Sequence, residues 1–199
     1  MPVRHVQVRR ARTGDVAHIR RLVDTYTADR RVLSKSTVNL YEDVQEFWVA
    51  EAETVVGADP GDPGPDGGPA GGGVERRLVG CGALHVLWED LAEVRTVAVD
   101  PSLRGFGIGH RIVAALLDTA RALGVRRVFC LTFETAFFAR HGFAPIQGAP
   151  VSSRVYEELL RSYDEGVAEF LDLERVKPNT LGNTRMLVHL GPGVEKTGG

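Results

Sequence analysis

The chain has 199 residues, a formal net charge of −2, 43% hydrophobic residues and 25% charged residues. This length and composition are typical of a small globular enzyme, so we expect residues 1–199 to form a single domain. The arginines are spread along the chain and no apolar run approaches the ~18 residues that cross a bilayer, which argues against nucleic-acid and membrane partners.

Hydrophobic periodicity predicts an α/β fold with a mixed sheet. His5–Arg10 alternates around Val6 and Val8, which predicts a strand. The helix that begins near Thr13–Asp15 has one apolar face, made of Ile19, Leu22, Val23 and Tyr26. The further predicted elements are a helix at 37–45, strands at 47–51, 77–87 and 91–99, a helix from Ile108 that Gly124 ends, a strand at 127–132, helices at 136–140 and 153–163, and a strand at 184–190. Gly80 and Gly82 indicate a twist or bulge in their strand.

One segment has a composition that does not suit a folded core. Gly57–Gly73 contains eight glycines, four prolines and three aspartates in seventeen residues. Such a segment buries too little apolar surface to offset its ordering entropy. We therefore expect a flexible loop at 57–73, inserted between strands that belong together, and a disordered tail at 191–199.

The most informative segment follows the strand at 91–99. It is a glycine loop, defined as residues 104–110, in which Gly105, Gly107 and Gly109 alternate with Phe106 and Ile108 before a helix begins. Alternate glycines let the backbone approach a bulky ligand and turn several N–H groups toward one point. The start of a helix adds unpaired N–H groups and the positive end of its dipole. The loop is therefore predicted to bind phosphate.

The spacing of the loop selects among phosphate ligands. The G-x-G-x-x-G dinucleotide fingerprint requires glycine where His110 stands, and a P-loop requires Lys-Ser/Thr after its last glycine. The pattern R-x-x-G-x-G, with Arg104, Gly107 and Gly109, resembles the acetyl-CoA diphosphate loop of the GNAT acetyltransferase superfamily. The alternative is a glycine-rich turn with no ligand.

The resemblance extends beyond this loop. Phe137–Phe143 is similar to the aromatic segment that follows the fifth strand of these proteins, and Leu91–Val99 to their fourth strand. In the substrate half, Val32–Ser36 and the segments Arg161–Leu173 and Asn183–Met186 resemble N-acetylglutamate synthases, in their short, stand-alone actinobacterial form. The resemblance spans about Val6 to Leu190, apart from the 57–73 loop.

This family implies a mixed, mostly antiparallel central sheet flanked by helices, with acetyl-CoA as co-substrate and no metal. It also implies that the backbone of Val97, Ala98 and Val99 pairs with the pantetheine arm. The implied contacts to the cofactor in the glycine loop come from Arg104, Gly105, Phe106, Gly107, Ile108, Gly109 and His110.

Acetyl transfer to an amine needs a base, and Glu93 is the candidate. In a regular strand Glu93, Arg95, Val97 and Val99 share one face. An acid and a cation in mid-strand, upstream of the cofactor edge, are unexpected in a core element. The alternative is a Glu93–Arg95 surface pair of little energetic value.

The other catalytic roles leave fewer traces in the sequence. A backbone N–H of Val97 or its neighbour is expected to stabilise the oxyanion. In this superfamily two adjacent strands separate at this point of the sheet. Many superfamily members have a tyrosine general acid where this chain has Phe138, which has no proton to give. A thiol with a pKa near 8.5 can leave without an acid, and the Thr135 hydroxyl is a weaker substitute.

Glutamate has two carboxylates, so its pocket needs cationic donors. The candidates within the resembling segments are Lys35, Arg95 and Arg185, and solvated surface charge is the alternative for each. The imidazole side chains of His110 and His141 are expected to have no direct role, although the backbone of His110 belongs to the predicted cofactor loop. Cys81 and Cys130 lie in predicted strands and are expected to be buried, reduced thiols, which together with the absence of a signal peptide favours a cytoplasmic location.

The sequence thus predicts an acetyl-CoA-dependent amino-acid N-acetyltransferase that acetylates L-glutamate, the first step of arginine biosynthesis, by direct attack. L-Glutamine, a polyamine or a protein lysine is an alternative acceptor. A non-catalytic acetyl-CoA sensor is an alternative of another class, which Phe138 keeps open. The superfamily favours a homodimer.

Overall fold

The computed structural model describes residues 3–27, 36–56, 73–149, 151–162, 167, 171 and 182–191. Most of the predicted loop at 57–73 and of the predicted tail at 191–199 lies outside these residues. The strands are β1 Val3–Arg10, β2 Phe47–Val56, β3 Gly73–Trp88, β4 Leu91–Val99, β5 Arg127–Thr132, β6 Ala144–Pro145 and β7 Thr184–His189. The helices are α1 Val16–Thr27, α2 Thr37–Glu42, α3 Ile108–Ala122, α4 Thr135–Ala139 and α5 Ser153–Leu159, with 3-10 turns at Thr13–Asp15, Val44–Glu46 and Pro101–Leu103.

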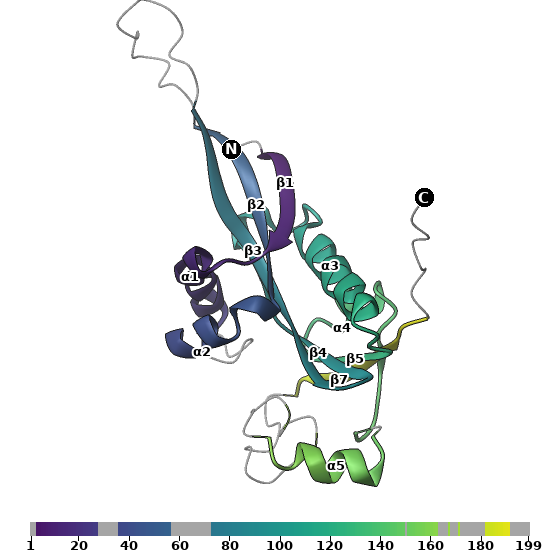
Figure 1. Cartoon of the computed structure of the whole chain (residues 1–199). Helices are drawn as coiled ribbons and strands as arrows, with labels where there is room; N and C mark the ends of the chain where they lie inside the picture. The colour runs from purple at the N-terminus through teal and green to yellow at the C-terminus, as the bar shows by residue number, and fades with distance from the viewer. Residues whose placement is uncertain are drawn as a thin grey trace, which may run out of the picture.

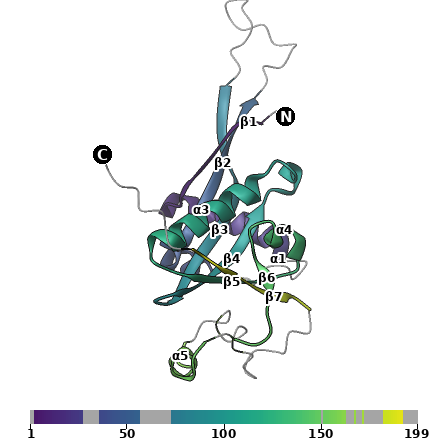
Figure 2. The same cartoon turned by 90° about the vertical axis from the view of Figure 1, so that its right-hand side faces the viewer.

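The described strands form one sheet in the order β1-β2-β3-β4-β5-β7-β6. Its neighbouring strands pair antiparallel except β4 and β5, which are parallel. Helix α3 crosses one face of the sheet, and α1 and α2 cover the other (Figures 1 and 2). The predicted mixed, mostly antiparallel sheet flanked by helices is confirmed.

Several element bounds differ from the prediction. Strands β2 and β3 extend beyond the predicted 47–51 and 77–87, because they pair with each other as far as Val56 and Gly73. Helix α5 ends at Leu159, earlier than the predicted 163. Strand β6 was not predicted, because two residues ending in proline show no periodicity.

A β-bulge in β4 changes which side chains share a face. Cys81 pairs with Ala98 and Ala83 with Arg95, so β4 has one residue more than β3 between these pairs, and Thr96 adopts φ +57°. Before the bulge, Ala92 and Val94 pack under α3, whereas after it Val97 does so. The prediction that Glu93, Arg95, Val97 and Val99 share one face is therefore wrong, because the extra residue reverses the alternation.

Strands β4 and β5 stay together only at their beginnings. Their paired residues are Leu91 with Arg127, Ala92 with Val128 and Glu93 with Phe129. Beyond these pairs β5 continues along β7 as far as Thr132, while β4 continues along β3. We call the opening after Glu93 and Phe129 the β4–β5 gap.

Two glycines allow α3 to lie close to the sheet. A Cβ added to Gly80 would lie 2.8 Å from Cδ1 of Ile112, and one added to Gly82 would lie 2.8 Å from Cγ2 of the same residue. The register of β2 and β3 also shifts beside Gly80, which confirms the predicted bulge there. Close approach of the helix therefore explains both glycines.

The first turn of α3 is packed against α4. An added Cβ on Gly109 would lie 3.2 Å from the ring of Phe137, so only a very small residue lets the two helices meet here. One residue later, His110 lies 4.7 Å from Phe137 between ring centroids and its Nδ1 is 2.8 Å from Nε2 of His141. The two histidines, expected to be bystanders, thus join α3 to the segment after α4.

Gly82→Ala is expected to lower the free energy of unfolding by about 1–3 kcal/mol. The added methyl would overlap Cγ2 of Ile112, close to the backbone of α3, and would also lie 3.2 Å from Leu116. Urea unfolding of purified protein measures the change. Gly14→Ala is the control, because an added Cβ there meets no atom within 4 Å. Equal stability of both variants would contradict this account of the packing.

Burial, together with the neighbouring His110, lowers the pKa of His141. Below the ordinary histidine pKa of about 6.5, the unfolded chain therefore binds a proton that the folded protein does not. The folded state is favoured above that pH and loses stability as the pH falls through the lowered pKa.

We expect the unfolding free energy to fall between about pH 8 and about pH 5.5, and to fall less in His141→Gln. Urea titrations at each pH measure the slope. His189→Gln, which alters an exposed histidine, is the matched control and should keep the wild-type slope. An unchanged slope in His141→Gln would contradict the assignment.

Candidate active site

The glycine loop connects β4 to α3 through two left-handed glycines. Asp100 caps the turn Pro101–Leu103, with its carboxylate accepting a hydrogen bond from the N–H of Ser102. Gly105 and Gly107 then adopt φ +87° and +74°, and Gly107 is the N-cap of α3 without a side-chain cap. An added Cβ at either glycine meets no atom within 4 Å, so the left-handed backbone, and not crowding, explains these glycines.

The amides of this loop suit an anion. Within the described residues, the backbone N–H groups of Gly105, Gly107, Ile108, Gly109 and His110 donate to no backbone or side-chain acceptor. Unpaired donors at the start of a fifteen-residue helix, at the positive end of its dipole, form an anion-binding site. The residues present therefore fit a diphosphate group.

Tyr26 of α1 links the glycine loop to the end of β4. Its hydroxyl donates to the carbonyl oxygen of Val99, and Nη2 of Arg104 lies 3.3 Å from the same hydroxyl. The Arg104 guanidinium also lies over the Tyr26 ring, 5.5 Å from its centroid. Arg104 is exposed in spite of these contacts, so its side chain borders both the loop and solvent.

A polar cluster lies on the sheet face opposite α3. It consists of Asp43, Glu46, His85, Glu93 and Arg95, which come from the α2–β2 connection, β3 and β4. Glu93 is only 4% exposed, which excludes the alternative of a surface pair. Such a carboxylate beside the start of the β4–β5 gap is unusual in a sheet core.

Arg95 binds the carboxylates of the polar cluster together. Its Nη2 lies 3.0 Å from Glu46 and 3.6 Å from Asp43, and its Nη1 lies 3.8 Å from Glu93. Nδ1 of His85 lies 2.6 Å from the other oxygen of Glu46. The cluster is therefore one connected network and not a set of separate surface charges.

Of the other two predicted substrate cations, the structure describes Arg185 but not Lys35. On β7 the side chain of Met186 packs under α3. Successive side chains of a strand point to opposite faces, so the side chain of Arg185 lies on the other face, which is the face of the polar cluster. It pairs with Leu131 on β5, two residues beyond the Phe129 that pairs with Glu93. Lys35 lies outside the described residues.

The ring of Phe138, which stands where many superfamily members have a tyrosine, is packed in the core. Phe138 is 6% exposed and packs edge-on against Phe143. Thr135 is the first residue of α4, where Glu134 takes the N-cap position. The described part of α4 therefore presents a phenyl ring in the core at the position of the usual tyrosine.

Both cysteines are buried and free, as predicted. Burial raises the pKa of Cys81 to about 12, and burial together with the charge of Glu93 raises the pKa of Cys130. Both thiols are therefore protonated at neutral pH and unsuited to act as nucleophiles.

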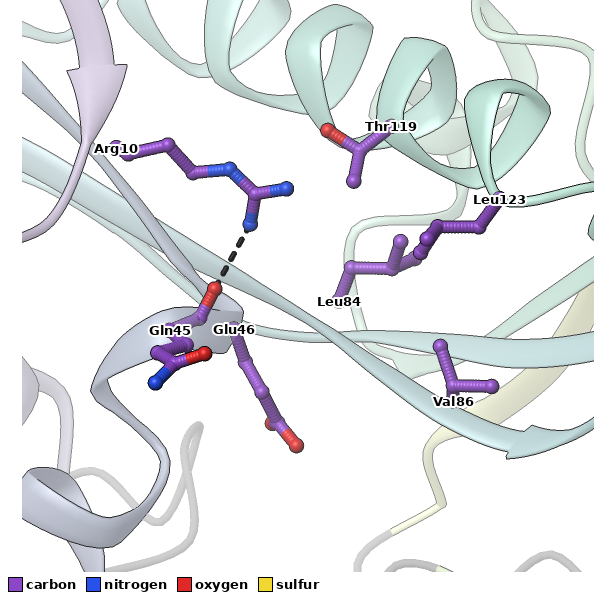
Figure 3. A pocket seen from close by; sticks show the side chains of 7 residues that line it. All are labelled: Arg10, Gln45, Glu46, Leu84, Val86, Thr119 and Leu123. Carbon is purple, nitrogen blue, oxygen red and sulfur yellow. Dashed lines mark hydrogen bonds between the residues drawn. The ribbon is translucent and has the colours of Figure 1, made fainter.

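A separate hollow of about 270 Å³ lies beside the second half of α3, remote from the glycine loop at its start (Figure 3). In Figure 3 the Arg10 side chain reaches the carbonyl oxygen of Gln45 across this hollow. The remaining side chains around it are those of Glu46, Leu84, Val86, Thr119 and Leu123. None of its lining residues was predicted as a site residue, and Glu46 is the one that also belongs to the polar cluster.

The part of the chain that the structure describes offers neither a metal site nor a membrane-spanning helix. No three His, Cys, Asp or Glu side chains there are arranged to hold a metal ion. Among the described helices, none has the length and apolar character needed to cross a membrane.

Four further members of the site were not predicted from the sequence: Tyr26, Asp43, Glu46 and His85. His85 did leave a signal: it continues the face of Cys81 and Ala83 along a strand that is otherwise apolar there. Asp43 and Glu46 gave no such signal in the sequence, because acidic residues after a short helix are common on protein surfaces.

Comparison with known proteins agrees with this geometry. The chain is 58% identical over 183 residues to an amino-acid acetyltransferase of Mycobacterium tuberculosis, a match that covers 92% of this chain and 94% of that protein. It is 31% identical over 140 residues to an amino-acid acetyltransferase of Neisseria meningitidis, covering 69% of this chain but only 27% of that longer relative.

Solved structures show the same fold. The crystal structure of Rv2747 from Mycobacterium tuberculosis in complex with CoA and NLQ has a TM-score of 0.77 and 57% identity, covering 93% of this chain and 99% of that one. The N-acetylglutamate synthase of Neisseria gonorrhoeae, complexed with coenzyme A and N-acetyl-glutamate, has a TM-score of 0.65 and 23% identity, covering 96% of this chain and 36% of that one.

A family model described as the acetyltransferase (GNAT) family matches residues 37–143, which is more than half of the chain and includes β4, the glycine loop and α4. The chain therefore belongs to the GNAT acetyltransferase family.

Proposed function

We propose that this protein is an amino-acid N-acetyltransferase that moves the acetyl group of acetyl-CoA to the α-amino group of L-glutamate. One observation supports this most strongly: the β4–β5 gap opens between an anion-binding loop and a buried carboxylate. The loop suits a diphosphate, and the carboxylate suits an amine that must lose a proton. A site for the cofactor diphosphate and a base for the substrate amine thus lie at the same opening of the sheet.

The glycine loop would hold the diphosphate of coenzyme A. The unpaired N–H groups of Gly105, Gly107, Ile108, Gly109 and His110 donate to its oxygens. Arg104, held beside the loop by Tyr26, adds a positive charge. Phe106 is 64% exposed and offers an apolar surface to the rest of the nucleotide.

The β4–β5 gap would lead the pantetheine arm from the glycine loop to the polar cluster. The backbone N–H of Asp100 donates to the carbonyl oxygen of Val79 on β3. Because successive N–H groups along a strand point to opposite sides, the N–H groups of Val99 and Val97 are expected to point away from β3, into the gap. Val97, Ala98 and Val99 form the edge along which the arm lies. The Val97 N–H is the expected oxyanion donor.

Glu93 would act as the general base. When bound, acetyl-CoA supplies a thioester whose carbonyl carbon the amine attacks directly. The Glu93 carboxylate takes a proton from the substrate ammonium, directly or through one water, and this leaves a lone pair for the attack. Its burial beside the gap keeps the base within reach of the amine and away from bulk water.

No side-chain acid would be needed for the departure of coenzyme A. Phe138 is packed in the core, and a thiolate with a conjugate-acid pKa near 8.5 is a stable enough leaving group. The thiolate then takes the second proton that the substrate nitrogen releases on becoming an amide, directly or through one water.

The two carboxylates of glutamate would be held by cations on the face opposite α3. Arg185 projects on this face, and Lys35 stays a predicted partner. Arg95 also stays predicted as a substrate contact, although its guanidinium already contacts Asp43, Glu46 and Glu93. A substrate carboxylate would have to compete with these three, so we expect Arg185 and Lys35 to contribute more.

The names of the relatives support the amino-acid acceptor. They include two amino-acid acetyltransferases and a synthase of N-acetylglutamate, one of which matches almost the whole chain. L-Glutamine remains the second candidate acceptor, because it differs from glutamate by one charge. Cytoplasmic location and a homodimer are further expectations for an enzyme of amino-acid biosynthesis.

A thiol-release assay tests the function. The purified protein is mixed with acetyl-CoA and a panel of glutamate, glutamine, other amino acids, polyamines and a lysine peptide, and free thiol is measured over time. We expect the highest kcat/KM with glutamate. Fastest turnover of a polyamine or peptide would overturn the assignment, and coenzyme A binding without turnover of any amine would indicate a sensor.

Glu93→Gln is expected to lower kcat at neutral pH by roughly 100-fold or more, and to recover in part as the pH rises and more of the amine is unprotonated. The KM for acetyl-CoA should stay near its wild-type value. Stopped assays across the pH range measure both. Glu89→Gln, in the exposed turn after β3, is the control. Wild-type turnover in Glu93→Gln would remove Glu93 as the base.

Arg185→Ala and Lys35→Ala are expected to raise the KM for glutamate far more than the KM for acetyl-CoA, because each removes a charged hydrogen bond to a substrate carboxylate. Initial rates with each substrate varied in turn measure the two constants. Arg126→Ala, at an exposed arginine before β5, should change neither. Equal losses for both substrates would indicate damage to the fold instead.

A further inference from the structure

The last turn of α1 brings a tyrosine to the base of the glycine loop. Ile19, Leu22 and Val23 of this helix pack against the sheet face opposite α3, and Tyr26 packs against the same cluster. A tyrosine has an apolar ring and a polar tip, so one side chain can pack on the core and bind a polar group beyond it. Tyr26 therefore links the core to the loop.

The hydroxyl of Tyr26 fixes the last peptide group of β4. It donates to the carbonyl oxygen of Val99, and the N–H of the same peptide group, which belongs to Asp100, donates to the carbonyl oxygen of Val79 at 2.8 Å. This peptide group is thus bonded to α1 on one side and to β3 on the other. Since the hydroxyl has one proton and gives it to Val99, its oxygen can only accept from other partners.

The oxygen and the ring of Tyr26 both contact the Arg104 guanidinium. Nη2 of Arg104 donates to the hydroxyl oxygen at 3.3 Å, and the guanidinium carbon lies 5.5 Å from the ring centroid. An exposed arginine otherwise samples many rotamers, and ordering it when a ligand binds costs conformational entropy. Contacts that hold the guanidinium in place beforehand reduce that cost.

Arg104 adjoins the anion-binding amides directly. It precedes Gly105, the first of the five loop residues whose N–H groups donate to no acceptor within the described part of the chain. A guanidinium can donate two parallel bonds to phosphate oxygens. The placement of the Arg104 side chain therefore affects how strongly the loop prefers a diphosphate to a ligand without one.

We propose that Tyr26 is a positioning residue that gives the site its preference for acetyl donors with a diphosphate. It holds the Arg104 guanidinium beside the glycine loop, where the guanidinium binds the diphosphate of coenzyme A. Tyr26 itself does not touch the reacting carbonyl. A thioester of pantetheine, which has no phosphate, gains nothing from this contact. The role rests on the proposed function, because that function puts coenzyme A on the glycine loop.

Binding calorimetry with coenzyme A tests this role. Arg104→Ala should raise Kd by about 10- to 100-fold, through the loss of charge-assisted hydrogen bonds. Tyr26→Phe keeps the ring but lacks the hydroxyl, and should raise Kd by roughly 3- to 10-fold. Adding Tyr26→Phe to Arg104→Ala should raise Kd by less than about 2-fold more, because the group that Tyr26 holds is then absent.

Two control variants and a kinetic comparison separate positioning from damage to the fold. Tyr41→Phe removes an exposed phenol hydroxyl on α2, and Arg21→Ala removes an exposed arginine on α1, so both should bind coenzyme A as the wild type does. Tyr26→Phe should have a wild-type melting temperature, kcat and KM for glutamate. Only its KM for acetyl-CoA should rise, which a general loosening of the structure would not produce.

A series of acetyl donors identifies the phosphate that the guanidinium binds. Acetyl-CoA and acetyl-dephospho-CoA both have the diphosphate, and the second lacks the phosphate on the ribose, whereas S-acetylpantetheine has neither. Tyr26→Phe and Arg104→Ala should lose kcat/KM with the first two donors and match the wild type with the third. A loss that disappears with acetyl-dephospho-CoA would assign Arg104 to the ribose phosphate and overturn the proposal.

The outcomes distinguish this proposal from the function on which it rests. If the wild type acetylates glutamate and Tyr26→Phe binds coenzyme A equally tightly, the positioning role is wrong and the function stands. Losses that simply add in the double variant would also overturn the role. If the wild type binds coenzyme A but acetylates no amine, the function fails, and the calorimetry still decides the role of Tyr26. A wild type that does not bind coenzyme A would overturn both.

Discussion

The arrangement of the site depends on one extra residue in β4. Thr96 adopts a left-handed backbone conformation that is uncommon for a β-branched residue, and the strand alternation reverses there. As a result, Glu93 and Arg95 face the side covered by α1 and α2, while Val97 continues under α3. A regular strand would have placed the carboxylate and Val97 on the same face. The bulge thus lets one strand place a buried carboxylate on one face of the sheet and pack against α3 on the other.

The parting of β4 and β5 complements this bulge. The two strands share only their first three pairs, and they separate at the residue that holds the buried carboxylate. Antiparallel partners on the outer sides, β3 and β7, keep each strand in place beyond that point. The sheet can therefore open without exposing an unsupported strand, and its backbone edge becomes available to a ligand.

The local elements could be predicted from the sequence, because periodicity and glycine positions report on neighbours along the chain. The glycine loop, the apolar face of α3 and the strand at β4 were recognised in this way. The bulge could not be, since Thr96-Val97-Ala98-Val99 suits either face of a sheet. The link between Glu46 and His85 joins residues 39 positions apart, and a histidine in an apolar strand does not indicate which side chain it contacts. Contacts made by tertiary packing alone leave little trace in a single sequence.

The contacts of Tyr26 have a consequence for how the two substrates influence each other. Its ring and hydroxyl join α1, on the sheet face of the polar cluster, to Val99 at the end of β4 and to Arg104 of the glycine loop. Thermodynamic linkage then imposes reciprocity: whatever coenzyme A does to this junction to favour the amino acid, the amino acid must do to the same degree in favour of coenzyme A. If both ligands bind as proposed, any coupling between them at this phenol would be measured as a ratio of dissociation constants.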